Sequence, residues 1–89
     1  MSLVRGMFKN KNGNRNNVCG SNIRRLRLAL EPHKSQRAFA DDLQLKGLDL
    51  DKNAIQRIES GQRFVTDIEL LVISDYLGVR CDELLRRKR

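Results

Sequence analysis

SQRAFADDLQLKGLDLDKNAIQRIESG, residues 35–61, is the stretch of sequence that decides the fold of this chain. Its first half predicts a helix, because Ser35 is suited to cap an N-terminus and apolar residues follow it at helical spacing. Gly47 ends this helix, since glycine is a poor helix former. The apolar stripe expected on the helix consists of Ala38, Phe39, Leu43 and Leu45.

The second half of the same stretch predicts another short helix. Asp49 or Asp51 caps its N-terminus, and Gly61 suits the left-handed position that commonly follows a helix. The residues of this helix that face inward are Ala54, Ile55 and Ile58. The whole stretch therefore predicts two amphipathic helices joined by a turn.

Three more helices are predicted on either side of this pair. Apolar residues spaced by three and four predict a helix over residues 21–30, which Pro32 ends. The sequence TDIE at residues 66–69 fits a capping box and opens a fourth helix, which Gly78 ends. A short fifth helix follows at residues 81–85. Short helices with short connections predict a compact all-α domain.

The composition limits the functions that are open to this chain. Its 89 residues suffice for one small domain. No apolar run approaches the roughly 20 residues of a membrane span, so we expect no membrane association and a cytoplasmic location. Cys19 and Cys81 lack the spacing of zinc ligands, and His33 is the only histidine. The sequence therefore predicts no metal site, no cofactor and no catalytic residue, and we do not expect an enzyme.

The net charge of +7 is concentrated at the two ends of the chain. The first 20 residues carry four basic residues and no acidic one, the last ten carry five basic and two acidic, and the rest is neutral. We expect a flexible, basic, asparagine-rich tail at residues 1–19, a domain at 20–85 and a basic tail at 86–89. Two basic ends beside a neutral domain favour a polyanionic partner.

With these helices placed, the chain resembles the Cro-type, lambda-repressor-like helix-turn-helix regulators, the XRE family. The segments that carry the resemblance are NIRRLR (22–27), SQRAFA (35–40), NAIQRIESGQR (53–63) and ELLVISDYLGVRCDELL (69–85). The turn between the two central helices is longer than in the family, and residues 44–48 (QLKGL) are the extra segment. The resemblance implies a compact five-helix DNA-binding domain, all-α, whose helix at about residues 51–60 reads the major groove.

The resemblance also assigns roles to individual polar residues. Side chains of the types that pair with base edges are predicted to read DNA at Lys52, Asn53, Gln56 and Arg57. Predicted phosphate contacts are Gln36, Arg37, Lys46, Gln62 and Arg63. A structural ion pair between the first and third helices is predicted for Arg27 and Glu59.

These roles imply a sequence-specific DNA-binding transcriptional regulator that acts as a repressor. We expect a homodimer on a pseudo-palindromic operator in double-stranded DNA, because one short helix contacts few base pairs. The expected dimer surface is Leu77, Val79, Leu84 and Leu85, with a place in the core as its alternative. Two other functions stay open. One is an antitoxin, in which the same domain also binds a protein toxin; the other is a protein-interaction adaptor that has kept the fold and lost DNA binding.

Overall fold

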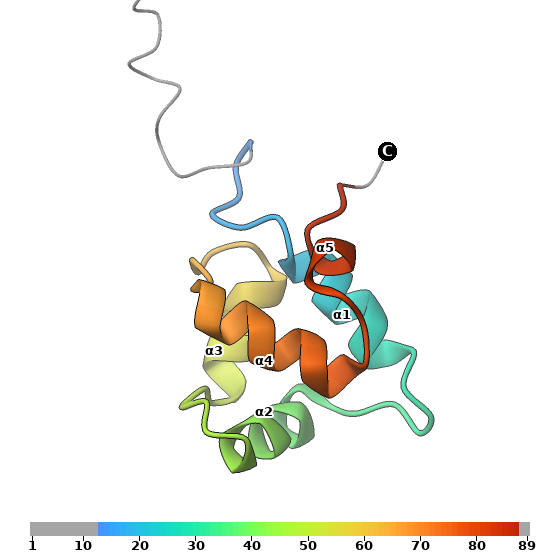
Figure 1. Cartoon of the computed structure of the whole chain (residues 1–89). Coiled ribbons are helices and arrows are strands. Elements are labelled where there is room, and N and C mark those ends of the chain that lie inside the picture. The colour runs from blue at the N-terminus through green and yellow to red at the C-terminus, as the bar shows by residue number, and fades with distance from the viewer. Residues whose placement is uncertain (1–12, 88–89) are drawn as a thin grey trace, which may run out of the picture.

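Five α-helices make up the described part of the chain, residues 13–87 of a computed structural model (Figure 1). They are α1 (Gly20–Leu28), α2 (Gln36–Leu45), α3 (Lys52–Glu59), α4 (Asp67–Leu77) and α5 (Cys81–Leu84). α3 packs against α1 and α2, while α4 packs against α2 and α5. The all-α class predicted from the sequence is confirmed for these residues. None of their helices is long and apolar enough to span a bilayer.

Side-chain caps start the three central helices, as the sequence predicts. Ser35 Oγ accepts a hydrogen bond of 3.1 Å from a first-turn N–H of α2. At the start of α3 the cap is Asp51 and not Asp49, and its carboxylate accepts from the N–H of Ala54 at 2.8 Å. The capping box predicted at residues 66–69 is present at the start of α4. These caps satisfy N–H groups that have no partner within their own helix.

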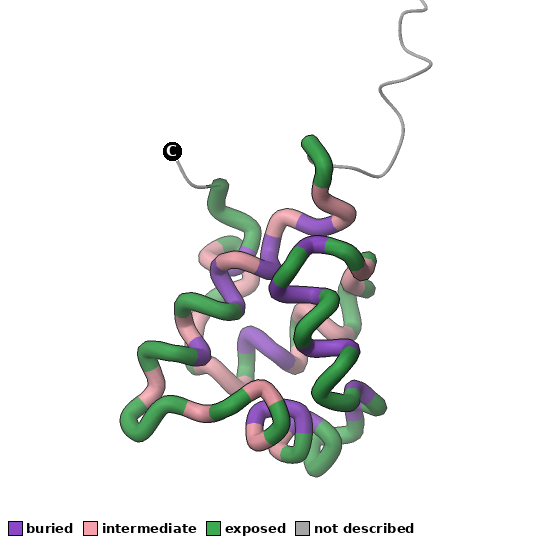
Figure 2. The backbone as a smooth tube through the Cα atoms, turned by 180° about the vertical axis from the view of Figure 1, so that it is seen from behind, coloured by how far each residue is buried: buried purple, intermediate pink, exposed green. Residues whose placement is uncertain are grey.

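The core is mainly aliphatic and lies where the five helices meet. Figure 2 shows the buried positions on the inner sides of the helices and the exposed positions outside. The largest fully buried apolar side chains are Phe39, Ile23, Leu43, Leu50, Ile55, Ile58, Ile73 and Leu84. Full burial of one such side chain contributes about 1.5–3 kcal/mol.

The longer turn between α2 and α3 is partly anchored in this core. Leu48 and Leu50 are buried there, whereas Lys46 and Gly47 are exposed. Gly47 has a φ of 97°, a left-handed conformation that favours glycine. Leu45, expected in the apolar stripe of α2, is instead 88% exposed, because the last turn of α2 extends beyond the core. The turn therefore forms a corner that Leu48 and Leu50 fix to the core and that exposes Leu45 and Lys46 to the solvent.

The N-terminal segment differs from the flexible tail that the sequence predicts. Asn17 and Cys19 are buried, at 9% and 2% exposure, and residues 15–17 are hydrogen-bonded to the domain. The predicted tail boundary at residue 19 is therefore wrong for its last residues, because their polar groups bind backbone carbonyls. The rest of that predicted tail, residues 1–12, lies outside the described residues, as do residues 88–89 of the C-terminal tail.

A polar cluster joins the loop before α2 and the second turn of α2 to α4. The Tyr76 hydroxyl donates to the Asp42 carboxylate, and Lys34 Nζ lies 2.8 Å from the same group. The hydrogen bond from Lys34, followed by that from Tyr76, holds the pKa of Asp42 below its usual value. Burial, followed by the bond to Asp42, raises the pKa of Tyr76. The ring of Tyr76 also meets Phe39 edge-on, with centroids 5.5 Å apart.

Acid is expected to weaken the fold through Asp42. Because its pKa is lower in the folded state, its stabilising contribution is complete above the unfolded value of about 4 and is lost as the pH falls through the folded value. Urea denaturation at a series of pH values is expected to show a free energy of unfolding that declines below about pH 4. Asp42→Asn should be less stable than the parent near neutrality and should decline less steeply in acid. Equal slopes would contradict this role.

Candidate nucleic-acid interface

α3 has an inner apolar side and an outer polar side. Ala54, Ile55 and Ile58 are buried, as the sequence predicts. The four predicted base-reading residues are exposed: Lys52, Asn53, Gln56 and Arg57. Within residues 13–87, none of these four side chains makes a hydrogen bond or an ion pair. The outer side therefore carries two positive charges and two amides that are available to a ligand.

A buried ion pair fixes the C-terminal end of α3 to α1. Arg27 Nε lies 2.7 Å from Glu59 Oε2, and Arg27 Nη2 donates to Glu59 Oε1 at 2.9 Å. Both side chains are almost fully buried, at 6% and 3% exposure. The predicted structural pair is therefore present, and its two parallel bonds define the position of α3 on α1.

The same cluster also holds the start of α2. Arg27 Nη1 donates to the carbonyl of Lys34 at 2.7 Å, which fixes the loop that precedes α2. Gln36 Nε2 donates to Glu59 Oε1 at 3.0 Å. Gln36, a predicted phosphate contact, thus already uses one of its N–H donors inside the domain. The cluster sets the orientation of α2 relative to α3.

Three of the other predicted phosphate contacts are exposed, and their side chains make no hydrogen bond or ion pair within the described part of the chain: Arg37, Lys46 and Gln62. They do not gather at one point. Arg37 lies in the first turn of α2, Lys46 follows the other end of that helix, and Gln62 follows α3. A ligand that contacted all three would have to extend past both ends of α3, as a nucleic-acid backbone does.

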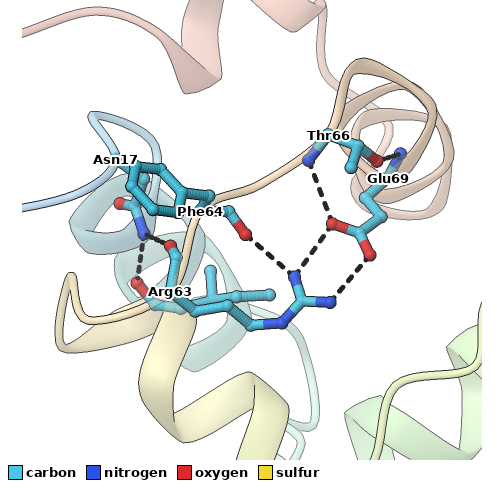
Figure 3. A network of polar contacts seen from close by, with 6 residues as sticks. Asn17, Arg63, Phe64, Thr66 and Glu69 are labelled. Carbon is cyan, nitrogen blue, oxygen red and sulfur yellow. Dashed lines mark hydrogen bonds and ion pairs between the residues drawn. The ribbon is translucent and has the colours of Figure 1, made fainter. Parts of the chain in front are cut away.

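Arg63 is placed differently from the prediction. Its guanidinium forms two bonds to the Glu69 carboxylate, of 2.9 and 3.0 Å, and a third to the carbonyl of Phe64 (Figure 3). The bond from Arg63 is the largest of the causes that hold the pKa of Glu69 below its usual value. Glu69 also belongs to the capping box of α4. Arg63 therefore stabilises the loop and the start of α4, instead of standing free to meet a phosphate.

The acidic side chains, the histidine and the cysteines among residues 13–87 do not form a metal site. No group of three or more side chains could hold a metal ion there. Both cysteines are free, and burial raises the pKa of Cys19 to about 11, so its thiol stays protonated near neutrality.

Comparison with protein-family models, with curated proteins and with solved structures finds no match. The arrangement of α2 and α3 and the side chains that they expose therefore carry the functional argument.

Sequence reasoning missed one set of contacts next to α3. Arg15, Asn16 and Asn17 donate hydrogen bonds to carbonyl groups at the end of α3 and in the loop that follows. No local pattern announces them, because a run of asparagine and charged residues is typical of a tail.

Proposed function

We propose that this chain is a sequence-specific DNA-binding transcriptional regulator, a repressor with a lambda-repressor-like helix-turn-helix formed by α2 and α3. One observation carries the proposal: α3 buries its apolar side and presents four unengaged side chains of the base-reading types. Arg and Lys suit guanine, whereas Asn and Gln suit adenine. The residues concerned are Lys52, Asn53, Gln56 and Arg57.

The rigid attachment of α3 supports this function. Base reading requires side chains held in a fixed register on a supporting scaffold. The buried Arg27–Glu59 pair provides that attachment on one side, and Gln36 links it to the start of α2. In the proposed complex the first turn of α2 rests on the phosphate backbone, where Arg37 and the helix N–H groups face an anion.

The extended turn before α3 contributes a phosphate contact to the proposed complex. Leu48 and Leu50 anchor it, so the exposed Lys46 stands on a fixed corner rather than on a loose loop. We assign Lys46 to a phosphate beside the N-terminal end of α3. The charge supplies affinity without sequence preference, because every phosphate is alike.

Selection of binding sites from random duplex DNA by the full chain tests the proposed function. The expected product is a pseudo-palindrome whose half-sites have centres about 34–36 Å apart, one turn of the duplex. Enrichment of no sequence, together with equal weak binding to all duplexes, would overturn the proposal. A protein-interaction adaptor would then be favoured.

The dimer surface expected from the sequence needs correction. Leu84 is fully buried, and Leu77 and Val79 are partly buried against the core, so only Leu85 of the expected set stands at the surface, at 49% exposure. The large apolar side chains exposed on α4, in the loop before it and at the end of α5 are instead Phe64, Ile68, Leu71 and Leu85. α4 is thus apolar on its outer side as well as its inner side. We assign this surface to a second copy of the chain, since a two-fold pair brings the same patch of each copy together.

Ile68→Glu is expected to abolish dimerisation, because it places a charge in the centre of an apolar contact. Light scattering should give the monomer mass for the variant, and its affinity for the selected palindrome should fall. Leu28→Glu on α1 likewise replaces an exposed aliphatic side chain by a charged one and should leave the mass and the affinity unchanged. A parent chain that binds a single half-site as a strict monomer would refute this assignment.

A further inference from the structure

A short N-terminal segment closes over the C-terminal end of α3. We call residues 15–17 the strap. The last carbonyls of any helix lack partners within the helix, so something else must satisfy them. Asn17 Nδ2 donates to the carbonyl of Ile58 at 3.0 Å and to that of Arg63 at 2.8 Å (Figure 3). One amide thus joins the last turn of α3 to the loop that follows it.

The other two strap residues bind the carbonyls in between. Arg15 Nη2 donates to the carbonyl of Glu59 at 2.9 Å. The N–H of Asn16 donates to the carbonyl of Gly61 at 2.7 Å, and its side chain donates to that of Gln62 at 2.9 Å. The positive charge of Arg15 also sits at the negative end of the helix dipole. Five of the six backbone carbonyls from residue 58 to residue 63 therefore accept a hydrogen bond from the strap.

The surrounding backbone is shaped to admit the strap. The N–H of Gly20 donates to Asn17 Oδ1 at 2.9 Å, which orients the amide so that its nitrogen faces the carbonyls. A Cβ on Gly20 would lie 2.0 Å from the carbonyl oxygen of Ile58. A Cβ on Gly61, whose φ is 84°, would lie 2.7 Å from the Arg15 guanidinium carbon. Gly20 thus allows the start of α1 to approach the end of α3, and Gly61 leaves room for the Arg15 side chain.

We propose that the strap positions the end of α3 and the loop after it for binding DNA, an inference that rests on the proposed function. Gln56 and Arg57 belong to the last turn of α3, and Gln62 lies in the loop. All three depend on the backbone that the strap holds. Arg15, Asn16 and Asn17 are positioning residues, because they act through that backbone and do not themselves read bases.

The consequence is a specific loss when the strap opens. If its bonds are removed, the end of α3 spends less time in the binding-competent arrangement, and the apparent dissociation constant rises in inverse proportion to that population. The strap forms no hydrogen bond to the residues at the start of α2 or at the start of α3. Binding to arbitrary sequences, which relies on phosphate charge, should therefore change much less than binding to the selected sequence.

Asn17→Leu in the full chain tests the proposal, because it keeps the side-chain size and removes the amide that bonds the carbonyls of Ile58 and Arg63 and that accepts from the N–H of Gly20. Circular dichroism establishes a temperature at which the variant is fully folded. The dissociation constant for the selected duplex is then expected to rise about tenfold, the effect of two lost neutral hydrogen bonds. That for a scrambled duplex of equal length should stay within about twofold. Base preference should relax at the pairs read by Gln56 and Arg57 and persist at those read by Lys52 and Asn53.

Asn14→Leu is the matched control, since Asn14 precedes the strap and is exposed. It should leave both dissociation constants unchanged. If Asn17→Leu does not fold, Asn16→Ala decides, because its side chain binds only the Gln62 carbonyl within the described residues, and it should weaken specific binding alone. A folded strap variant with the parent's specific affinity, or with equal losses on both duplexes, would overturn the proposal. A parent that does not distinguish the duplexes would overturn the proposed function itself.

Discussion

Glu59→Gln is expected to remove about 3–5 kcal/mol from the free energy of unfolding, the largest loss from any single substitution considered for this domain. The substitution keeps the shape of the side chain and removes its charge. Arg27 would then remain buried, at 6% exposure, without its anion. Native domains are stable by only about 5–15 kcal/mol, so roughly a fifth of the total or more would be lost. Urea denaturation followed by circular dichroism measures the effect.

Two comparisons isolate the burial of the pair as the cause. Asp82→Asn breaks the ion pair with Arg80, whose side chains are 83% and 65% exposed, and should change stability by less than about 1 kcal/mol. The double replacement Arg27→Met with Glu59→Leu should recover much of the loss, because two apolar side chains leave no buried charge uncompensated. A Glu59→Gln variant as stable as the parent would show that the pair is not a structural element.

The helices could be predicted from the sequence because their signals are local. Ser35, Asp51 and the box at residues 66–69 each bind an N–H three residues away, so sequence spacing alone specifies the contact. The pair of Arg27 and Glu59 spans 32 residues and was predictable only through a resemblance of segments. Once the two motifs were matched to a known arrangement, the contact between them followed.

The contacts of the strap could not be predicted, because they are polar and long-range. Pattern rules detect segments with apolar residues to bury, and the asparagine-rich segment has few. Asn17 is nevertheless buried, since its amide satisfies carbonyls that lie 41 and 46 residues further along the chain. Nothing in the local sequence of either segment shows that the other will supply its partners.

Arg63 and Leu84 show a second limit, which concerns the direction of a side chain. Arg63 follows α3 and carries the charge that a phosphate contact needs, yet Glu69 offers it two oxygens six residues later. Leu84 and Leu85 are adjacent and chemically identical, but one is fully buried and the other is half exposed. The sequence indicates which residues have suitable chemistry, whereas packing decides which of them remain available at the surface.

Asn53→Ala and Arg57→Ala are each expected to weaken binding to the selected duplex by about 1–3 kcal/mol, roughly ten- to a hundredfold in the dissociation constant. Both side chains are exposed and have no partner within residues 13–87, so the fold should keep its stability. Binding to duplexes substituted at each position should show that each variant loses discrimination at its own base pair. All affinities should be measured at one fixed salt concentration, because contacts to phosphates make every affinity depend on salt.

Arg24→Ala supplies the matched control for Arg57→Ala. It removes the same charge from an exposed position on α1 and should leave sequence preference unaltered. Loss of a base contact relaxes the preference at one position, whereas loss of a phosphate contact weakens binding to all sequences alike. If Arg57→Ala weakened binding to all sequences alike, Arg57 would be a phosphate ligand. Recognition of bases would then depend on the other exposed residues of α3. If both alanine variants bound the selected duplex as the parent does, α3 would not be the helix that reads DNA.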